Sequence, residues 1–407
     1  MRWLLLFVPL LGCQAQQEWS GELSLLARIK ERIAENLSRL PNYTCAEKIE
    51  RSARSAASRK WKLVDNVRLE VAFVNGNELY GWPGANRIDE SEITSLVSGT
   101  IGNGDFALIT RGIFESPSTS FEFRGASDAG EQPAIRYDYR VPVSASGYHL
   151  KSGDHEAVVP YHGSFWVDPQ TLDLLRLELS ADGIPDHLGL VASTKILEYR
   201  EARIGNSDFV LPTGATLDMV DFTGQENRNR SHFQDCRQYA GDSTLRFDNL
   251  EDRTAPVALK SVREIELPVD FEADLSLVSP LDSSASAVGD QIQLRLRGAL
   301  RARNQVLAPR GAMFKARLIE LHEAGNFYHV RLAFESLEFQ NSHADLHARD
   351  NVISMPMKIS ATAHRSLRAY KPGELRTSGS LVIEADRLPL SHRFTFHLRS
   401  KLIKSQQ

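Results

Sequence analysis

Short stretches in which apolar and polar residues alternate recur along most of the chain, and this alternation constrains the fold more than any other feature. Residues 67–73 and 291–297 are clear examples from the two halves. A period of two residues indicates strands with one buried face. Turn signals such as Asn75-Gly76 and Asp168-Pro169 lie between successive stretches and favour hairpins. The sequence therefore predicts a mostly antiparallel β protein.

Helical periodicity is confined to a few segments, of which one is strong. Its apolar residues recur three and four positions apart before Pro41: Leu26, Ile29, Ile33, Leu37 and Leu40. Ser20 is a suitable N-cap for this amphipathic helix. Weaker patterns predict two short helices at 91–98 and 105–115. Together with the strands, these helices place the chain in the α+β class.

The length of 407 residues favours two domains. A hydrophobic content of 42% and a charged content of 25% are typical of a globular protein and exclude a disordered or coiled-coil chain. The polar, proline-containing segment 251–267 is the expected linker. We therefore expect an α+β domain over 17–250 and a small all-β barrel or sandwich over 268–407.

Residues 1–16 have the organisation of a secretory signal peptide. Arg2 precedes an apolar run, Trp3 to Leu11, which is too short to cross a bilayer. Two cleavages fit: removal of the peptide after Ala15, or a lipobox-like cut that leaves Cys13 as a lipidated first residue. The protein is therefore expected in the periplasm or secreted, or attached to the outer membrane if Cys13 is lipidated. No later run predicts a transmembrane span in the mature chain.

Three cysteines occur, and both cleavages assign Cys13 to the export signal. Cys45 and Cys236 remain, and in an oxidising compartment two such thiols are a candidate disulfide. Two buried free thiols are the alternative. A bridge would close a loop of roughly 190 residues and would place the end of the first domain soon after Cys236.

Over residues 22–247 the chain resembles the LolA type, the family of periplasmic lipoprotein carriers and their relatives. The resemblance rests on the opening helix, on successive strands with two short helices between them, and on one turn. That turn, Phe165-Trp166-Val167-Asp168-Pro169-Gln170-Thr171-Leu172, is similar to the family's strand, Asp-Pro-x-Thr, strand signature. The resemblance implies a half-open antiparallel barrel with lid helices over an apolar concavity. The C-terminal domain and the cysteine pair depart from plain carriers.

Residues 280–321 resemble a module of TrbI-like conjugation-channel proteins. The resemblance rests on Pro280, Leu281, Ser283, Val288-Gly289-Asp290, Ala308-Pro309-Arg310-Gly311-Ala312 and Lys315-Ala316-Arg317. Arg310 stands where the module usually has Lys, and Ala316 where it has Gly. The resemblance implies a β-barrel-like extracytoplasmic module. The combination of signal, LolA-like domain and this module resembles secreted proteins of soil acidobacteria.

Aromatic residues of the first domain are candidates for the lining of an apolar pocket. They are Phe73, Tyr80, Trp82, Phe106, Phe114, Phe121, Phe123, Phe165 and Trp166. Ordinary core packing is the favoured alternative, although the concave face of a half-barrel serves as both core and binding surface. The hypothesis is that a lipid acyl chain or a lipidated protein binds there.

The net charge of −4 combines an acidic first domain with a basic second domain. The basic side chains gather in one segment: Arg295, Arg297, Arg301, Arg303, Arg310, Lys315 and Arg317. Such a surface would bind anionic lipid heads or a cell-wall polymer. A solvated face, or docking against the acidic first domain, is the favoured alternative. A nucleic-acid partner is not expected.

Motifs for catalysis or metal binding are not recognisable. His155-Glu156 and His162 lack the H-E-x-x-H spacing, and Pro160 between them excludes a helix. A looser site of His149, His155 and His162 on strands is less favoured than exposed hairpin histidines. Ser164 lacks the second glycine of a nucleophile elbow. No catalytic residue, metal or cofactor is therefore predicted.

The sequence thus favours a non-enzymatic extracytoplasmic envelope protein that binds a hydrophobic ligand or a lipidated partner in a half-barrel. Two alternatives stay open. One is a structural or assembly component of an envelope or secretion apparatus. The other is an envelope hydrolase whose site has no sequence signature.

Overall fold

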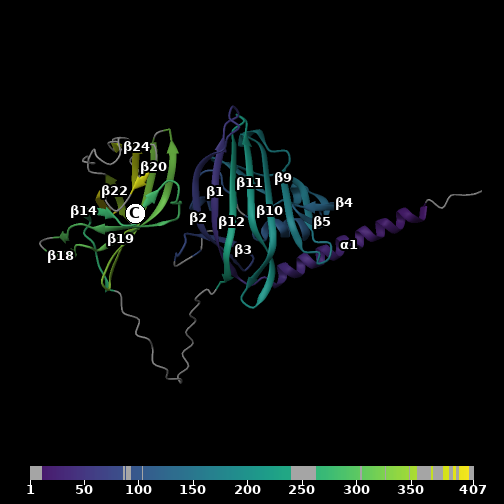
Figure 1. Cartoon of the computed structure of the whole chain (residues 1–407), viewed down its shortest axis with the longest axis horizontal. Helices are drawn as coiled ribbons and strands as arrows, with labels where there is room; N and C mark the ends of the chain where they lie inside the picture. Colours follow the sequence, from purple (N-terminus) through teal and green to yellow (C-terminus); the bar gives the residue numbers. More distant parts are fainter. Residues whose placement is uncertain are drawn as a thin grey trace, which may run out of the picture.

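The chain folds into two β-rich units, and the computed structural model shows them side by side (Figure 1). The structure describes residues 12–85, 88, 93–102, 104–239, 263–302, 305–325, 327–347, 349–354, 368–369, 379–384, 388–390 and 394–402. The predicted signal sequence up to Leu11 and most of the predicted linker lie outside these residues. No helix among the described residues is long and apolar enough to cross a membrane.

The first unit is one ten-stranded sheet in which every neighbouring pair is antiparallel. In sheet order its strands are β3 (Asn77–Gly81), β2 (Lys62–Val74), β1 (Tyr43–Arg54), β12 (Glu226–Gln238), β11 (Ser207–Asp221), β10 (Leu190–Ile204), β9 (Leu174–Ala181), β8 (Tyr161–Val167), β5 (Gln132–Val141) and β4 (Ser120–Ala129). The sheet is open because β3 and β4 are edge strands. The predicted fold class, an α+β protein with an open antiparallel half-barrel, is confirmed.

The helices of the first unit are α1 (Gly12–Arg39) and α2 (Leu108–Phe114), with 3-10 turns η1 (Ile93–Ser95), η2 (Val143–Ala145) and η3 (Asp186–Leu188). A two-stranded hairpin, β6 (His149–Ser152) and β7 (His155–Val158), lies beside the sheet. α1 begins ahead of Ser20, so Ser20 is not its N-cap. Ile29, Ile33 and Leu37 of α1 are buried against the sheet core, while the N-terminal part of the helix extends beyond the sheet (Figure 1).

Both predicted hairpin turns are present. Asn75 and Gly76 have φ angles of 52° and 84°, the left-handed pair that a type I′ turn between β2 and β3 requires. Between β8 and β9, the Asp168 carboxylate accepts the backbone N–H groups of Gln170 at 2.8 Å and Thr171 at 2.9 Å. These hydrogen bonds lower the pKa of Asp168. Local turn chemistry therefore sets the register of both hairpins.

Cys45 and Cys236 form the predicted disulfide. They lie on β1 and β12, which are neighbours in the sheet although the two cysteines are 191 residues apart in sequence. The bridge joins the first and last strands of the unit. It therefore links the strand by which the chain enters the sheet to the strand by which it leaves.

The second unit is built around another sheet, whose main path is β13 (Arg263–Glu264), β21 (Ser342–Asp345), β20 (Phe327–Phe339), β19 (Met313–Ala324), β16 (Gln291–Leu296), β14 (Asp270–Leu277), β26 (Thr395–Leu402) and β22 (Arg349–Ser354). β24 (Ser380–Glu384) also pairs with β20, and β23 (Arg368–Ala369) pairs with β24. Two short ladders join β15 (Leu281–Asp282) to β25 (Pro389–Leu390), and β17 (Leu300–Ala302) to β18 (Gln305–Ala308). β13 begins at Arg263, so residues 263–264, predicted as linker, belong to this sheet.

The two units are joined by backbone contacts. Val288 forms a parallel bridge with Val67 of β2. Its N–H donates to the Asn66 carbonyl, and its carbonyl accepts the Arg68 N–H, both at 2.8 Å. Val288 is 2% exposed and is counted within the hydrophobic core of the first unit. Val288, a residue of the second unit, therefore packs into the hydrophobic core of the first unit.

Candidate functional site

Four charged side chains lie inside the half-barrel, where the strand pattern places apolar residues. We call Glu47, Glu78, Asp105 and Lys195 the buried charge cluster; as whole residues, each is 6% exposed or less. Three of them come from strands β1, β3 and β10, and Asp105 precedes α2. Side chains two positions apart share a face of a strand. Residues at that spacing, among them Ile49, Tyr80 and Leu197, belong to the buried core, so the charges point inward by the same alternation.

Lys195 and Asp105 form an ion pair, and their side chains are only 2% and 9% exposed. Burial lowers the pKa of Lys195, but the Asp105 carboxylate together with Tyr148 and Glu78 outweighs it and the pKa is raised. Lys195 is therefore charged inside the half-barrel. A buried charge of this kind is stable only while its partner is in place.

Glu78 binds the segment that leads into α2. Its carboxylate accepts the backbone N–H groups of Gly104 at 2.8 Å and Phe106 at 2.9 Å, and the Tyr80 hydroxyl at 2.8 Å. Burial raises the pKa of Glu78, and these hydrogen bonds oppose the rise. The sheet thus holds this segment at two points, through the Glu78 carboxylate and through the Lys195 ammonium, which binds Asp105. The cluster thus fixes where α2 begins.

Glu47 is a buried carboxyl group of the cluster whose pKa lies near neutrality. Burial, followed by the nearby Asp105 carboxylate, raises its pKa to about 8, although a hydrogen bond with Ser231 and the Lys195 charge oppose the rise. A carboxyl group with such a pKa can exchange a proton near neutral pH. Glu47 is only 3% exposed, so an outside molecule could contact it only after the elements that pack over the half-barrel had moved.

Most of the predicted pocket aromatics do gather in the half-barrel, but they pack against one another. Phe73, Tyr80, Phe106, Phe114 and Phe165 are buried members of one core, and Trp82, Phe121 and Phe123 are partly buried against it. Phe106 illustrates the packing, with ring centroids 5.5 Å from Tyr43 and 4.9 Å from Phe233. In this conformation, the aromatic residues that were expected to line a pocket fill the core with their own side chains.

Trp166 lies apart from the other predicted pocket residues. Phe165 belongs to the core, and successive strand residues point to opposite faces. Trp166 instead lies between Arg136 and Arg176, whose guanidinium carbons are 5.3 Å and 5.8 Å from its ring. Its placement in the pocket is corrected here: alternation along β8 turns it to the outer face.

A small cavity lies between α1 and the sheet, with a volume of about 20 Å³. Ile33 of α1 and Leu174 and Tyr199 of the sheet are among the residues that line it. A space of this size holds about one water molecule. An acyl chain therefore does not fit at this place unless α1 moves.

Polar contacts fix α1 over the sheet. Arg32 pairs with Asp173, Nε to Oδ1 at 2.8 Å. The Asn36 amide donates to the Val210 carbonyl at 2.9 Å and accepts the Val210 N–H at 3.0 Å. Both contacts lie in the C-terminal half of α1. They hold the apolar stripe of the helix on the core.

The predicted basic surface is only partly assembled. Arg295, Arg297, Arg301 and Arg310 are exposed, and Arg303 lies outside the described residues. The Lys315 ammonium is 2.7 Å from the Glu338 carboxylate.

Arg317 was expected on the same surface, and its burial corrects that expectation. Its side chain is 6% exposed and pairs with Glu335 at 2.8 Å. Its Nη1 donates to the carbonyl of Gly289 at 3.0 Å and, across the junction of the two units, to that of Pro83 at 3.1 Å. Arg317 is thus an internal anchor between the units.

Among the residues that the structure describes, the three histidines considered for a loose metal site do not form a group of metal ligands. His149 and His155 are exposed on the β6–β7 hairpin, and Nδ1 of His162 is 2.8 Å from Asp182. The Ser164 hydroxyl donates to Asp138 at 2.6 Å.

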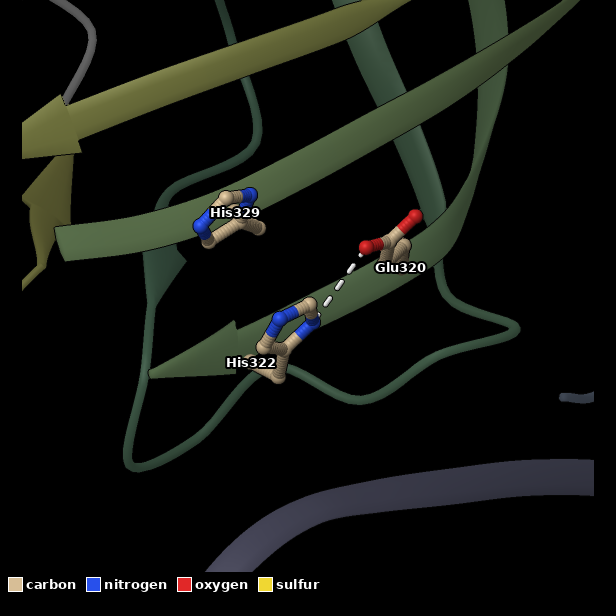
Figure 2. Close-up of side chains that lie close together, drawn as sticks. All are labelled: Glu320, His322 and His329. Carbon is tan, nitrogen blue, oxygen red and sulfur yellow. Dashed lines mark ion pairs between the residues drawn. The ribbon is translucent and has the colours of Figure 1, made fainter. Parts of the chain in front are cut away.

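A different cluster, which the sequence did not reveal, lies on the β19–β20 hairpin (Figure 2). Glu320, His322 and His329 bring metal-ligand atoms within 4.8 Å of one another. Glu320 and His322 are two residues apart on one strand, which indicates a shared face. The contribution of His329 depends on the register of the hairpin, in which it is directly opposite His322.

The solved structures that are similar to this chain each cover about half of it. No family model and no curated protein matches the chain. A solved LolA superfamily protein from Nitrosomonas europaea is similar at 10% identity and a TM-score of 0.27, over 53% of this chain and 94% of that protein. A DUF1329 family protein from Desulfovibrio piger is similar at 13% identity and the same TM-score, over 54% and 94%. At TM-scores this low, neither similarity carries an argument about this chain. Its fold is defined by its own strand order.

Proposed function

We propose that the protein is a non-enzymatic binding protein of the cell envelope whose half-barrel receives an acyl chain or a lipidated partner. The observation that carries this proposal is the cover of the half-barrel. One amphipathic helix, α1, closes the apolar face of an open sheet, and polar contacts of Arg32 and Asn36 hold it there. Movement of α1 would expose a continuous apolar surface of the kind that hydrophobic ligands bind.

An extracytoplasmic location follows from the same reasoning. The Cys45–Cys236 disulfide is typical of oxidising compartments. The N-terminal segment has the organisation of an export signal, and lipidation of Cys13 would anchor the chain through the start of α1. A protein held at a membrane in this way would have its cover helix next to the lipid phase.

The exposed arginines of the second unit support a supplementary role at an anionic envelope surface. Arg295, Arg297, Arg301 and Arg310 are available for such contacts. Electrostatic attraction to anionic lipids is additive and sensitive to salt. In this arrangement the second unit would orient the first at the surface from which the hydrophobic ligand comes.

Binding of a fluorescent fatty acid tests the half-barrel proposal. The double variant Arg32→Ala/Asn36→Ala should bind the probe several-fold more tightly than the wild type, because the open state would no longer be held closed by those contacts. Arg28→Ala is the matched control, since Arg28 is an exposed arginine of the same helix. Native mass spectrometry of the purified protein should detect co-purified lipid.

Two results would contradict the proposal. One is the absence of probe binding to both the wild type and the double variant. The other is binding that the double variant and the Arg28→Ala control change equally, because α1 would then not act as the cover.

A further inference from the structure

We propose that Glu320, His322 and His329 form a binding site for a divalent transition-metal ion, with Zn²⁺ as the best-matched ion. The site lies on the second unit and is separate from the half-barrel function. Its three side chains lie together on the β19–β20 hairpin (Figure 2).

Strand register brings the three residues together. His322 is directly opposite His329, and Glu320 is opposite Arg331. All four side chains of these two pairs therefore lie on one face of the hairpin. The imidazole rings of His322 and His329 are parallel, with centroids 4.8 Å apart. The geometry needs only side-chain rotation for the rings to share one ion, because the backbone already places them as cross-strand neighbours.

The donor set matches the chemistry of the proposed ion. Two imidazoles and one carboxylate are ligands that Zn²⁺ takes in proteins, and they leave a fourth position for water or an outside ligand. Imidazole also suits Cu²⁺ and Ni²⁺, whereas Ca²⁺ and Mg²⁺ require oxygen-rich sites. The side chains are accessible, since His322 and Glu320 are 37% and 33% exposed. An ion could therefore enter without unfolding of the hairpin.

Arg331 orients the carboxylate toward the histidines. Its Nε is 3.1 Å from Oε2 of Glu320, while Oε1 of Glu320 is 3.2 Å from Nδ1 of His322. One carboxylate oxygen thus forms an ion pair with the arginine, and the other faces the proposed site. Outer contacts that orient a ligand in this way commonly support metal sites. Arg331 is consequently a positioning residue, not a ligand.

Calorimetric titration of Zn²⁺ into the full-length protein tests the proposal, after treatment with chelator and removal of any histidine tag. The expected stoichiometry is one ion per chain at about pH 7.5. His322→Ala and His329→Ala should each raise the dissociation constant by about tenfold or more. His343→Ala is the matched control, because His343 also lies beside a glutamate, 3.8 Å from Glu338. It should leave Zn²⁺ binding unchanged.

A spectroscopic measurement on the wild type avoids any dependence on variants that fold poorly. Electron paramagnetic resonance of the protein with one equivalent of Cu²⁺ should show coupling to two imidazole nitrogens. Coupling to a single nitrogen would overturn the proposal. So would the absence of Zn²⁺ binding to the wild type, or an unchanged dissociation constant in a folded His329→Ala variant.

Discussion

Lys195 of β10 and Asp105 of the segment before α2 form an ion pair inside the half-barrel, although their positions are 90 residues apart. The pair joins a central strand of the sheet to the entrance of a covering helix. Since both side chains are nearly out of contact with solvent, each charge depends on the other for compensation.

Removal of one member of this pair should be costly. Lys195→Met should destabilise the protein by about 3–5 kcal/mol, because Asp105 would stay buried without its partner. The double variant Lys195→Met/Asp105→Asn should lose less than the sum of the two single losses. Urea unfolding measures both, with Lys48→Met on the exposed face of β1 as the control. Additive losses would show that the two side chains do not compensate each other.

Glu47 should make stability fall as the pH rises. Its pKa is raised to about 8 by burial, against the usual value of 4.5 in an unfolded chain. Between these values the folded state binds the extra proton, so stability declines from about pH 4.5 to pH 8 and then levels off. Glu47→Gln should remove this decline and be more stable than the wild type by about 1–3 kcal/mol at pH 8.5.

The pH dependence of Glu47→Gln is best measured by urea unfolding from pH 5 to pH 9. Glu50→Gln, an exposed change on the same strand, is the control and should follow the wild-type profile. A Glu47→Gln profile that runs parallel to the wild type at every pH would rule out titration of Glu47 in this range.

Loss of the disulfide should destabilise the first unit. Cys45→Ala/Cys236→Ala should lower the free energy of unfolding by about 2–5 kcal/mol, since the bridge restricts the unfolded chain. Thermal unfolding with and without dithiothreitol checks this prediction. The reductant should destabilise the wild type but leave the variant unchanged, and equal sensitivity of the two proteins would mean that the bridge does not form.

Gly289 should control the contact between the two units. Its φ is +101°, and a Cβ atom there would lie 2.1 Å from the backbone oxygen of Arg68. Gly289→Ala should therefore separate the units while each stays folded, which small-angle scattering would show as a larger radius of gyration. Gly298→Ala is the control, because a Cβ at that position meets nothing within 4 Å. Unchanged scattering for Gly289→Ala would refute this role.

Local chemistry made several elements predictable from sequence. The turns at Asn75-Gly76 and Asp168 depend on neighbouring residues, and the disulfide required only a count of cysteines and an oxidising compartment. The burial of Glu47 could also have been predicted from the sequence. Glu47 lies two positions from Cys45 and from Ile49 on one strand, and both of these residues are buried. A charged residue at a position where the alternation predicts a buried apolar residue was the sequence signal for the buried charge cluster.

Long-range register was not predictable in the same way. Alternation along a strand separates two faces but does not say which face is covered, so Arg317 was expected at the surface. Trp166 is different: it was expected in the same pocket as Phe165, although alternation turns adjacent side chains to opposite faces. Arg317, a residue of the second unit, is buried because the first unit packs over it. His329 joins Glu320 and His322 only through the pairing of β19 with β20. Such placements depend on tertiary contacts that no short segment of sequence specifies.

The pairing of β1 with β12 also determines when the first unit can be completed. Tyr43 pairs with Gln238, and the backbone N–H of Tyr239 donates to the Asn42 carbonyl at 2.8 Å. A chain delivered from its N-terminus would hold Cys45 as a free thiol until nearly the whole unit had emerged. Contacts of such high sequence separation form late and slowly. An oxidoreductase could then form the bridge only after Cys236 had been translocated, which makes this bond the last step in assembly of the first sheet.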